Sequence, residues 1–378
     1  MAVLSEEQRM LRDAAESWAR ERAPVTAFRR LRDAGAPLGY DPALYREIAE
    51  MGWAGILVPE AYGGCDFGHP SMGLVLEALG RTLTASPLVS TAVAGVSAFA
   101  LGGTDAQRGR WLPALAAGEA VAALAVDEGA RHAPAMTALA AVRTGAGWRL
   151  DGIKRPVLHG MAADLLVVAA RTGGRPGDAD GITLFLVGAG ADGVSRAPLQ
   201  EIERRGAALV RFDGVAVGDD AVLGAPGEGG VLLDRVLDRA RAAVAAELLG
   251  SSTQAFHTTL DYLKTRVQFG QIIGRFQALQ HRAAVLYGEL ELARSAVEAA
   301  LAALDEEGPD TPALVSLAKA LAGDTARRVA AEMIQLHGGI GMTDEHDAGF
   351  YLKRARVGDM SYGNAAFHRE RYAVLNGY

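Results

Sequence analysis

The sequence has few of the features that crosslink a chain, anchor it in a membrane or bind nucleic acid. Its 378 residues contain one cysteine, Cys65, so an intramolecular disulfide is excluded. A net charge of −7 without basic blocks argues against a nucleic-acid partner. The apolar stretch 87–101 is too short to span a membrane and fits a buried helix. The first residues form no secretory signal, so we expect a cytoplasmic protein with no membrane insertion.

What the sequence does contain is typical of a soluble globular protein of two or three domains. Half of its residues are hydrophobic and 22% are charged. Residues 1–118 have a helical pattern. Ser5 with Gln8, and Thr104 with Gln107, have the spacing of capping boxes, in which both side chains satisfy backbone groups at a helix start. We therefore predict a helical N-terminal domain.

Residues 119–228 are predicted to form a β domain. No helical pattern separates its short apolar runs, so we expect an antiparallel arrangement of strands. Gly188, Gly190 and Gly193 match the GxGxxG spacing of dinucleotide-binding loops, but no helical pattern follows them. A loop between strands is therefore favoured there. The predicted strands are 121–126, 139–144, 148–153, 165–170, 182–187 and 209–217.

Residues 229–378 are predicted to form a C-terminal four-helix bundle. Helical periodicity returns at residue 230 and predicts long helices at about 276–306 and 311–336, with shorter helices near 344–356 and 365–375. The predicted fold class is thus mainly α with a β domain in the middle of the chain.

The segment 262–277 carries the first motif with chemical content. Arg266, Gln268 and Phe269 stand beside Gly270 and Gly274, so a bidentate phosphate donor, an amide and a stacking ring lie next to approachable backbone. This combination suits a cofactor that bears a pyrophosphate. The alternative is a turn between helices, with Phe269 in the core and Arg266 in solvent.

The second motif is the glycine-rich turn at 335–343, which follows a predicted helix. Gly338, Gly339 and Gly341 exceed what one helix end requires, which indicates close backbone approach to a ligand. His337 and His346 lie near acidic residues, but their spacing fits no zinc pattern, so no metal is predicted. Thr343-Asp344 is interpreted as a helix N-cap.

Together the two motifs resemble the acyl-CoA dehydrogenase family. Further similarity at 4–9, 51–64, 151–154 and 351–354 extends the resemblance over nearly the whole chain. The resemblance implies an N-terminal helical domain, a middle β domain and a C-terminal four-helix bundle. It also implies a tetramer that binds FAD across a subunit interface.

In that family, the two motifs of one subunit hold the pyrophosphate and adenosine half of FAD, while the flavin ring lies in the other subunit. A carboxylate base removes a proton from the carbon next to the thioester of an acyl-CoA, and a hydride passes to the flavin. The resemblance carries the cofactor role to six residues: Arg266, Gln268, Phe269, Gln335, Gly338 and Gly339.

Three departures put the family reaction in question for this chain alone. The usual base is the Glu of a Tyr-Glu-Gly-Thr motif, and Gly363 stands at that place. A minority of the family has its base at a position that matches Ala240, which is also inert. The two segments that normally contact the flavin ring match 127–132 and 156–159, and both differ from the family pattern.

Glu247 is the one carboxylate that we consider as a substitute base. It lies in an apolar helix, where burial raises the pKa of carboxyl groups in general. The favoured alternative is a Glu paired with an Arg inside the bundle or at the subunit interface. Asp238 and Arg241 match family positions that contact the acyl-CoA, or else form an exposed helical pair.

The predicted function is that of a non-catalytic subunit. It would donate the adenosine half of the FAD site to a paralogous acyl-CoA dehydrogenase subunit that carries the base, in a homo- or hetero-tetramer. Such pairs act on steroid side-chain thioesters in the family, and the run 363–369 resembles their C-termini. The alternative is a stand-alone member that binds an acyl thioester or performs a different flavin reaction.

Overall fold

The computed structural model describes residues 3–178 and 180–378, which group into two compact units. One unit comprises Met1–Arg29, His69–Thr84 and Arg241–Tyr378, and the other comprises Arg30–Gly68 and Ala85–Ala240. The three domain ranges 1–118, 119–228 and 229–378 stay a prediction. Within the described residues, no helix is both long and apolar enough to cross a membrane.

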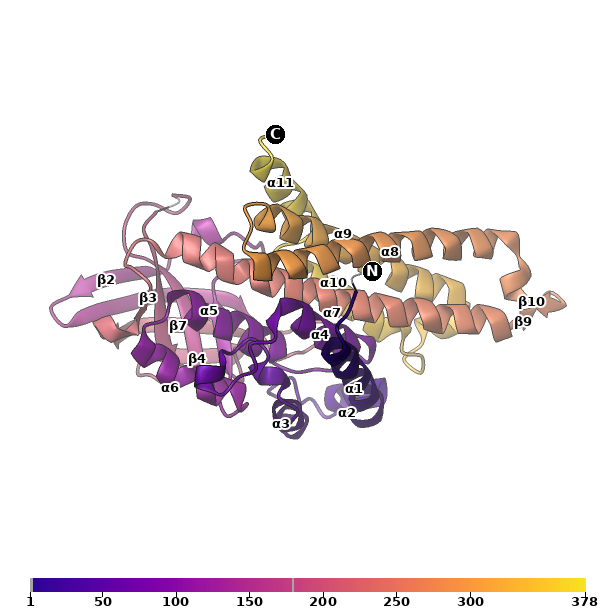
Figure 1. Ribbon diagram of the computed structural model, residues 1–378, viewed down its shortest axis with the longest axis horizontal. Helices are drawn as coiled ribbons and strands as arrows, with labels where there is room; N and C mark the ends of the chain where they lie inside the picture. The colour runs from indigo at the N-terminus through magenta and orange to yellow at the C-terminus, as the bar shows by residue number, and fades with distance from the viewer. Residues whose placement is uncertain (1–2, 179) are drawn as a thin grey trace. The chain divides into compact units, whose positions relative to one another are not determined.

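Figure 1 labels the main helices and strands along the chain. The helices are α1 (Glu6–Arg22), α2 (Val25–Asp33), α3 (Pro42–Glu50), α4 (Gly68–Arg81), α5 (Val96–Gly102), α6 (Asp105–Ala116), α7 (Gly229–Thr265), α8 (Gln277–Glu306), α9 (Thr311–His337), α10 (Ala348–Met360) and α11 (Ala365–Leu375). The strands are β1 (Ala122–Ala125), β2 (Ala140–Thr144), β3 (Gly147–Val157), β4 (Leu165–Arg171), β5 (Ile182–Gly188), β6 (Val194–Pro198), β7 (Ala208–Val217), β8 (Val222–Leu223), β9 (Val267–Gln268) and β10 (Gln271–Ile272).

The predicted β domain is confirmed, with a mixed rather than wholly antiparallel sheet. In the described part of the chain its eight strands follow the order β6-β7-β3-β2-β4-β5-β8, with β1 beside β4. Most pairs are antiparallel, but β4 is parallel to both β1 and β2. The β2–β3 hairpin lies in the chain between β1 and β4, so the connection is long enough for a parallel return without a helix. The predicted loop at Gly188–Gly193 indeed joins two strands, β5 and β6.

The core of this sheet consists of small and β-branched side chains with a few aromatic rings. Val168, Phe185 and Val210 are fully buried, and the Trp148 ring packs edge-on against Phe185 with centroids 5.5 Å apart. The apolar stretch 87–101 is buried, as predicted, and helical: Val89–Gly95 forms a π-helix that continues into α5. These contacts give the β-containing unit its own apolar core.

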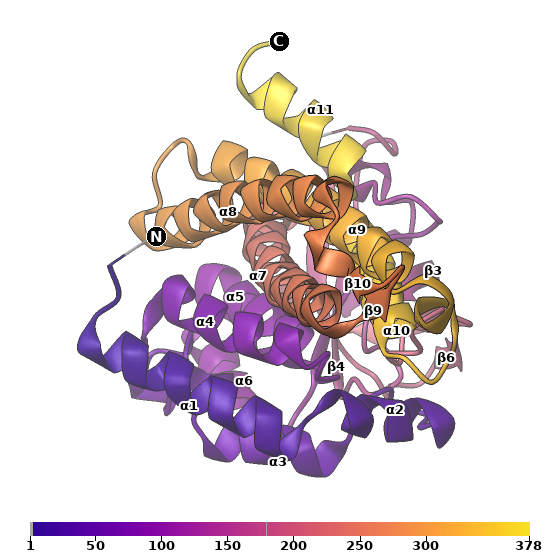
Figure 2. The ribbon, with the colours of Figure 1, turned by 90° about the vertical axis from the view of Figure 1, so that its right-hand side faces the viewer.

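In the other unit, α4 and α7 cross where two glycines let the backbones touch. A Cβ atom on Gly80 would lie 2.2 Å from the carbonyl oxygen of Glu247, and one on Gly250 would lie 1.9 Å from that of Glu77. Both separations are far below van der Waals contact, so only glycine permits this crossing. Figure 2 shows α7 nearly end-on, with α4 beside it.

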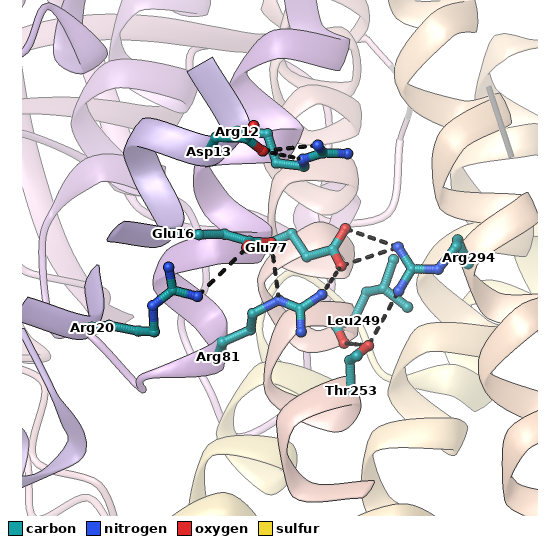
Figure 3. A network of polar contacts seen from close by, with 9 residues as sticks. All are labelled: Arg12, Asp13, Glu16, Arg20, Glu77, Arg81, Leu249, Thr253 and Arg294. Atoms are coloured by element: carbon teal, nitrogen blue, oxygen red, sulfur yellow. Dashed lines mark hydrogen bonds and ion pairs between the residues drawn. The ribbon is translucent and has the colours of Figure 1, made fainter. Parts of the chain in front are cut away.

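A polar network surrounds the same crossing (Figure 3). The Glu77 carboxylate accepts hydrogen bonds from Arg81 at 3.1 Å and from Arg294 of α8 at 3.0 Å. Arg294 also donates to the Thr253 hydroxyl of α7 at 3.3 Å. Charge-assisted bonds of this kind fix the angles of three helices as well as their separation.

The first residues of the helices show which sequence patterns predicted a helix start correctly. Both capping boxes are confirmed, because Ser5 and Thr104 each accept from the backbone of the predicted glutamine. The N-cap predicted at Thr343-Asp344 is wrong, since α10 begins at Ala348. The Asp347 carboxylate accepts from Arg29 at 2.7 Å, and Asp344 faces the same guanidinium. An arginine, rather than helix N–H groups, engages these acids.

The glycine crossing predicts opposite effects for two mid-helix substitutions. Gly250→Ala forces a methyl group against the α4 backbone and should lower the free energy of unfolding by about 1–3 kcal/mol. Gly288→Ala on α8 is the matched control, because its Cβ meets nothing within 4 Å. That change should raise stability by up to about 1 kcal/mol, since alanine is the better helix former. Chemical denaturation measures both, and equal effects would contradict the crossing.

Candidate cofactor-binding site

The two sequence motifs meet in one hollow of about 840 Å³. It lies within the unit that contains α8 and α9, between the β9–β10 hairpin, the start of α8 and the end of α9. All six residues that the resemblance assigned to the cofactor line it: Arg266, Gln268, Phe269, Gln335, Gly338 and Gly339. The structure therefore brings together two segments that are about seventy residues apart in the sequence.

The hairpin holds Phe269 in an unusual conformation. Gln268 pairs with Gln271, so Phe269 and Gly270 form a two-residue turn with φ of +53° and +77°. Such turns require positive φ at both central residues, which is common for glycine and costly for phenylalanine. Phe269 is 89% exposed, so the alternative that placed its ring in the core is wrong. An exposed aromatic ring on a strained turn is typical of a contact residue.

At the other wall, α9 ends in open backbone. Gly338 has a φ of +63° and its N–H bonds the carbonyl of Gln335. A Cβ on Gly338 or Gly339 would meet nothing within 4 Å, whereas one on Gly341 would lie 2.7 Å from the Ile334 carbonyl oxygen. Gly341 therefore serves packing. Gly338 and Gly339 leave space in the hollow for another molecule.

An aromatic wall includes a buried imidazole with unused bonding capacity. The rings of Tyr262 and His337 lie 4.4 Å apart. His337 Nδ1 is 2.7 Å from the Met333 carbonyl oxygen, so Nδ1 carries the proton and donates it. Burial lowers the pKa of His337 and keeps the ring neutral. Its Nε2 atom is buried and has no hydrogen-bond partner among the described residues, which leaves an acceptor for a ligand.

Eight lining residues were not predicted as cofactor contacts from the sequence. Three of them, Ala278, Leu279 and Arg282, lie in the first turns of α8, and the others are Tyr262, Ile273, Phe276, Leu336 and His337. Leu279 and Arg282 are three residues apart, so they share a helix face. The spacing can be recognised in the sequence, but on a surface helix it is equally typical of a face exposed to solvent. The hollow thus combines cations, flat rings and open backbone, which fits the adenosine diphosphate half of FAD.

The expected base position lies elsewhere in the same unit and is filled. Gly363 is buried at φ +104°, and a Cβ there would lie 2.5 Å from the Phe367 ring and 2.9 Å from His368 Nε2. His368 is fully buried and bonds the Tyr362 carbonyl through Nε2 at 3.1 Å. The place of a carboxylate is therefore occupied by two rings.

A buried lysine holds this turn in place. Lys319 of α9 is fully buried, and its Nζ donates to the carbonyls of Gly358, Asp359 and Gly363, each at 2.9 Å. Burial lowers the pKa of Lys319 to about 7, while Asp359 opposes that shift. Three carbonyl acceptors match the three donors of an ammonium group. The Lys319 Nζ atom therefore links the end of α10 to the turn before α11.

Glu247 is paired with an arginine. Its carboxylate accepts from Arg354 Nη1 at 2.7 Å, and both side chains are buried. Arg354 also donates to the Leu83 carbonyl at 3.0 Å. This geometry agrees with the favoured alternative of a structural pair. A carboxylate committed to a guanidinium is a poor proton acceptor.

Asp238 and Arg241 do not form an exposed helical pair. Asp238 is 4% exposed and Arg241 is 1% exposed. Arg241 Nε donates to the Tyr362 carbonyl at 3.3 Å, and its guanidinium lies 5.6 Å from the centre of the Phe367 ring. The exposed alternative is therefore wrong, because both side chains are buried. A contact of these residues with acyl-CoA stays a prediction.

In the β-containing unit, each of the two segments expected to contact the flavin ring has a polar side chain that bonds within the unit. Glu128 accepts from Lys154 at 2.7 Å and from the backbone N–H of Ala138 at 3.0 Å. His159 Nδ1 lies 2.7 Å from the Ser90 hydroxyl, with the imidazole buried. These side chains stabilise the unit that contains them.

Comparisons with known proteins agree with this architecture. The model of the acyl-CoA dehydrogenase N-terminal domain matches residues 5–119, and that of the C-terminal domain matches 227–374. Acyl-CoA dehydrogenase IpdE2 of Mycobacterium tuberculosis is 32% identical over 353 residues, which cover 93% of this chain and 91% of the relative.

Two solved structures are similar over nearly their full length. Butyryl-CoA dehydrogenase from Megasphaera elsdenii has a TM-score of 0.92 and 25% identity, covering 100% of this chain and 99% of that one. The Tcur3481-Tcur3483 steroid acyl-CoA dehydrogenase has a TM-score of 0.86 and 32% identity, covering 98% of each chain.

The chain belongs to the acyl-CoA dehydrogenase family. The predicted fold, mainly α with a β domain, is confirmed by the matching structures. Members of this family are FAD-binding flavoproteins, which confirms the predicted cofactor at the level of the family. Bound FAD would supply the hydride acceptor for dehydrogenation.

The buried pair makes a prediction about Glu247. Glu247→Gln removes the carboxylate 2.7 Å from the buried Arg354 guanidinium and should cost about 3–5 kcal/mol of stability. Glu289→Gln is the matched control, because Glu289 pairs with Arg328 between α8 and α9 at the surface. That exposed pair should contribute less than about 1 kcal/mol. Denaturant unfolding of both variants measures the difference, and a Glu247 cost no greater than the Glu289 cost would refute a structural role.

Proposed function

We propose that this chain is the base-less subunit of a heteromeric acyl-CoA dehydrogenase. It binds the adenosine and pyrophosphate half of FAD through Arg266, Gln268, Phe269, Gln335, Gly338 and Gly339. The flavin ring, the catalytic carboxylate and the acyl-CoA thioester belong to a paralogous subunit, in a tetramer of the family kind. The reaction of the assembly is α,β-dehydrogenation of the acyl group.

The observation that carries this proposal is the contrast between two places in one unit. The hollow lined by both motifs keeps open backbone, exposed rings and cationic side chains. The turn at Gly363 has no carboxylate, and the rings of Phe367 and His368 fill the space. A subunit that supplies half of a cofactor site must keep its cofactor-binding residues but needs no base, because cofactor binding and proton abstraction are separable tasks.

Two further observations support the proposal. Glu247, the substitute base considered above, is committed to Arg354. Glu128 and His159, one from each segment expected at the flavin ring, make hydrogen bonds inside the β-containing unit. The paired name of the steroid acyl-CoA dehydrogenase at 32% identity is consistent with a two-chain assembly and with a steroid side-chain thioester as substrate.

Arg266 gives the first test of the proposed role. The chain is co-expressed with a paralogous subunit, for example from a neighbouring gene. Arg266→Ala should reduce the FAD content of the complex at least about fivefold, because a charge-assisted phosphate contact is lost. Lys264→Ala is the control: it removes an exposed cation two residues away that does not line the hollow. FAD is quantified by absorbance after gel filtration, and unchanged occupancy in Arg266→Ala would disprove the contact.

Gly363 gives the second test. Gly363→Glu should not give the isolated chain dehydrogenase activity, because the new side chain meets two rings within 3 Å of its Cβ. The measurement is anaerobic bleaching of the flavin by a panel of acyl-CoA thioesters, with the chain supplied with FAD. Bleaching by wild-type chain alone would contradict the heteromeric role and favour a stand-alone dehydrogenase. Bleaching only by Gly363→Glu would show that the closed turn opens easily.

A further inference from the structure

Arg282 enters the hollow from a helix that neither motif includes. It lies on α8, one helical turn beyond the lining residues Ala278 and Leu279. Its Nε and Nη2 atoms lie 2.7 and 2.6 Å from one oxygen, Oε2, of Glu332 on α9. The third guanidinium nitrogen, Nη1, makes no hydrogen bond or ion pair with a described residue. Glu332 therefore braces the side chain and leaves one donor group unused.

The electrostatics of the hollow favour an anion at this place. Two arginines line it, Arg266 and Arg282, and none of its described lining residues is acidic. The N-terminal end of α8 adds partial positive charge, since no side chain caps its first turn at Phe276. Glu332 is not in the lining, so it orients Arg282 from outside the hollow and offsets part of its charge, while Arg266 and the helix end keep the hollow positive.

A single negative group would need only one arginine, whereas a diphosphate has charge for two. A guanidinium has N–H donors on three nitrogens, so Nε and Nη2 can hold Glu332 while Nη1 donates to a phosphate, an arrangement that a lysine ammonium lacks. The lining also offers the rings of Tyr262, Phe269 and Phe276, which suit a flat base beside the phosphates. The chemistry of the wall matches adenosine diphosphate as a unit.

We propose that Arg282, held by Glu332, is a second phosphate-binding residue of this hollow and binds the diphosphate of its ligand together with Arg266. This inference rests on the proposed function for the identity of the ligand, FAD. The inference itself concerns recognition of the diphosphate. A comparison of ADP binding with adenosine binding tests it without any measurement of turnover. The interaction is direct, from Nη1 to a phosphate oxygen, and the Glu332 pair stays intact on binding.

The test is isothermal titration calorimetry. The purified full-length chain, freed of flavin, is titrated with ADP and separately with adenosine. Arg282→Gln should weaken ADP binding about tenfold, the loss expected for one charge-assisted hydrogen bond. Adenosine binding should stay within about twofold of wild type. Raising the salt concentration should weaken ADP binding less in Arg282→Gln than in wild type, since one screened charge is gone.

The matched control is Arg328→Gln. It breaks another ion pair between α8 and α9, with Glu289, and does not line this hollow. It should leave ADP binding unchanged, whereas a general loosening of the two helices would weaken binding in both variants. Arg282→Lys, which keeps the charge but not the fork of donors, should fall between wild type and Arg282→Gln.

The outcomes separate this inference from the proposed function. If Arg266→Ala weakens ADP binding and Arg282→Gln does not, the Arg282 contact is refuted and the proposed function stands. If the wild-type chain alone dehydrogenates acyl-CoA but Arg282→Gln still weakens ADP binding, the heteromeric role fails and the Arg282 contact stands. Equal losses for ADP and adenosine in Arg282→Gln, or no binding of ADP to wild type, would also overturn the contact.

Discussion

The turn between α10 and α11 depends on one ammonium group. Lys319 donates to three backbone carbonyls that come from the end of α10 and from Gly363. A buried cation is costly unless all its donors are used, so the turn and the lysine stabilise each other. Because this turn is fixed, Phe367 and His368 lie where a base would project. The absence of a carboxylate is therefore part of a packed arrangement and not a single missing side chain.

The same unit keeps a second region open. The hollow between the hairpin, α8 and α9 contains Phe269 on a strained turn and His337 with a buried, unused acceptor. Both features cost folding free energy, about 1–3 kcal/mol in each case by general experience with backbone strain and unsatisfied polar groups. Such costs are typical of sites that are completed by a ligand. A hollow that was only a gap in packing would need neither the strained turn nor the buried acceptor without a partner.

The sequence was sufficient for local features and for motif membership. Ser5 and Thr104 start helices because their caps are local, and all six motif residues line one hollow because a tight hairpin and a helix end are encoded within a few residues. Arg282 could not be distinguished from a solvated helical residue, since its role depends on Glu332 of another helix. The parallel pairing of β4 was missed for the same reason: strand neighbours are set by distant contacts. Thr343 had a favourable local pattern, but Arg29 engages the nearby acids.

The central claim is that this chain supplies half of one FAD site and no complete site of its own. Native mass spectrometry of the co-expressed assembly tests it most directly, because the technique counts chains and FAD molecules in one particle. The account predicts one FAD for each pair of unlike chains, and no stoichiometric FAD on assemblies of this chain alone. Two FAD molecules for each unlike pair, or full occupancy of the chain by itself, would contradict it.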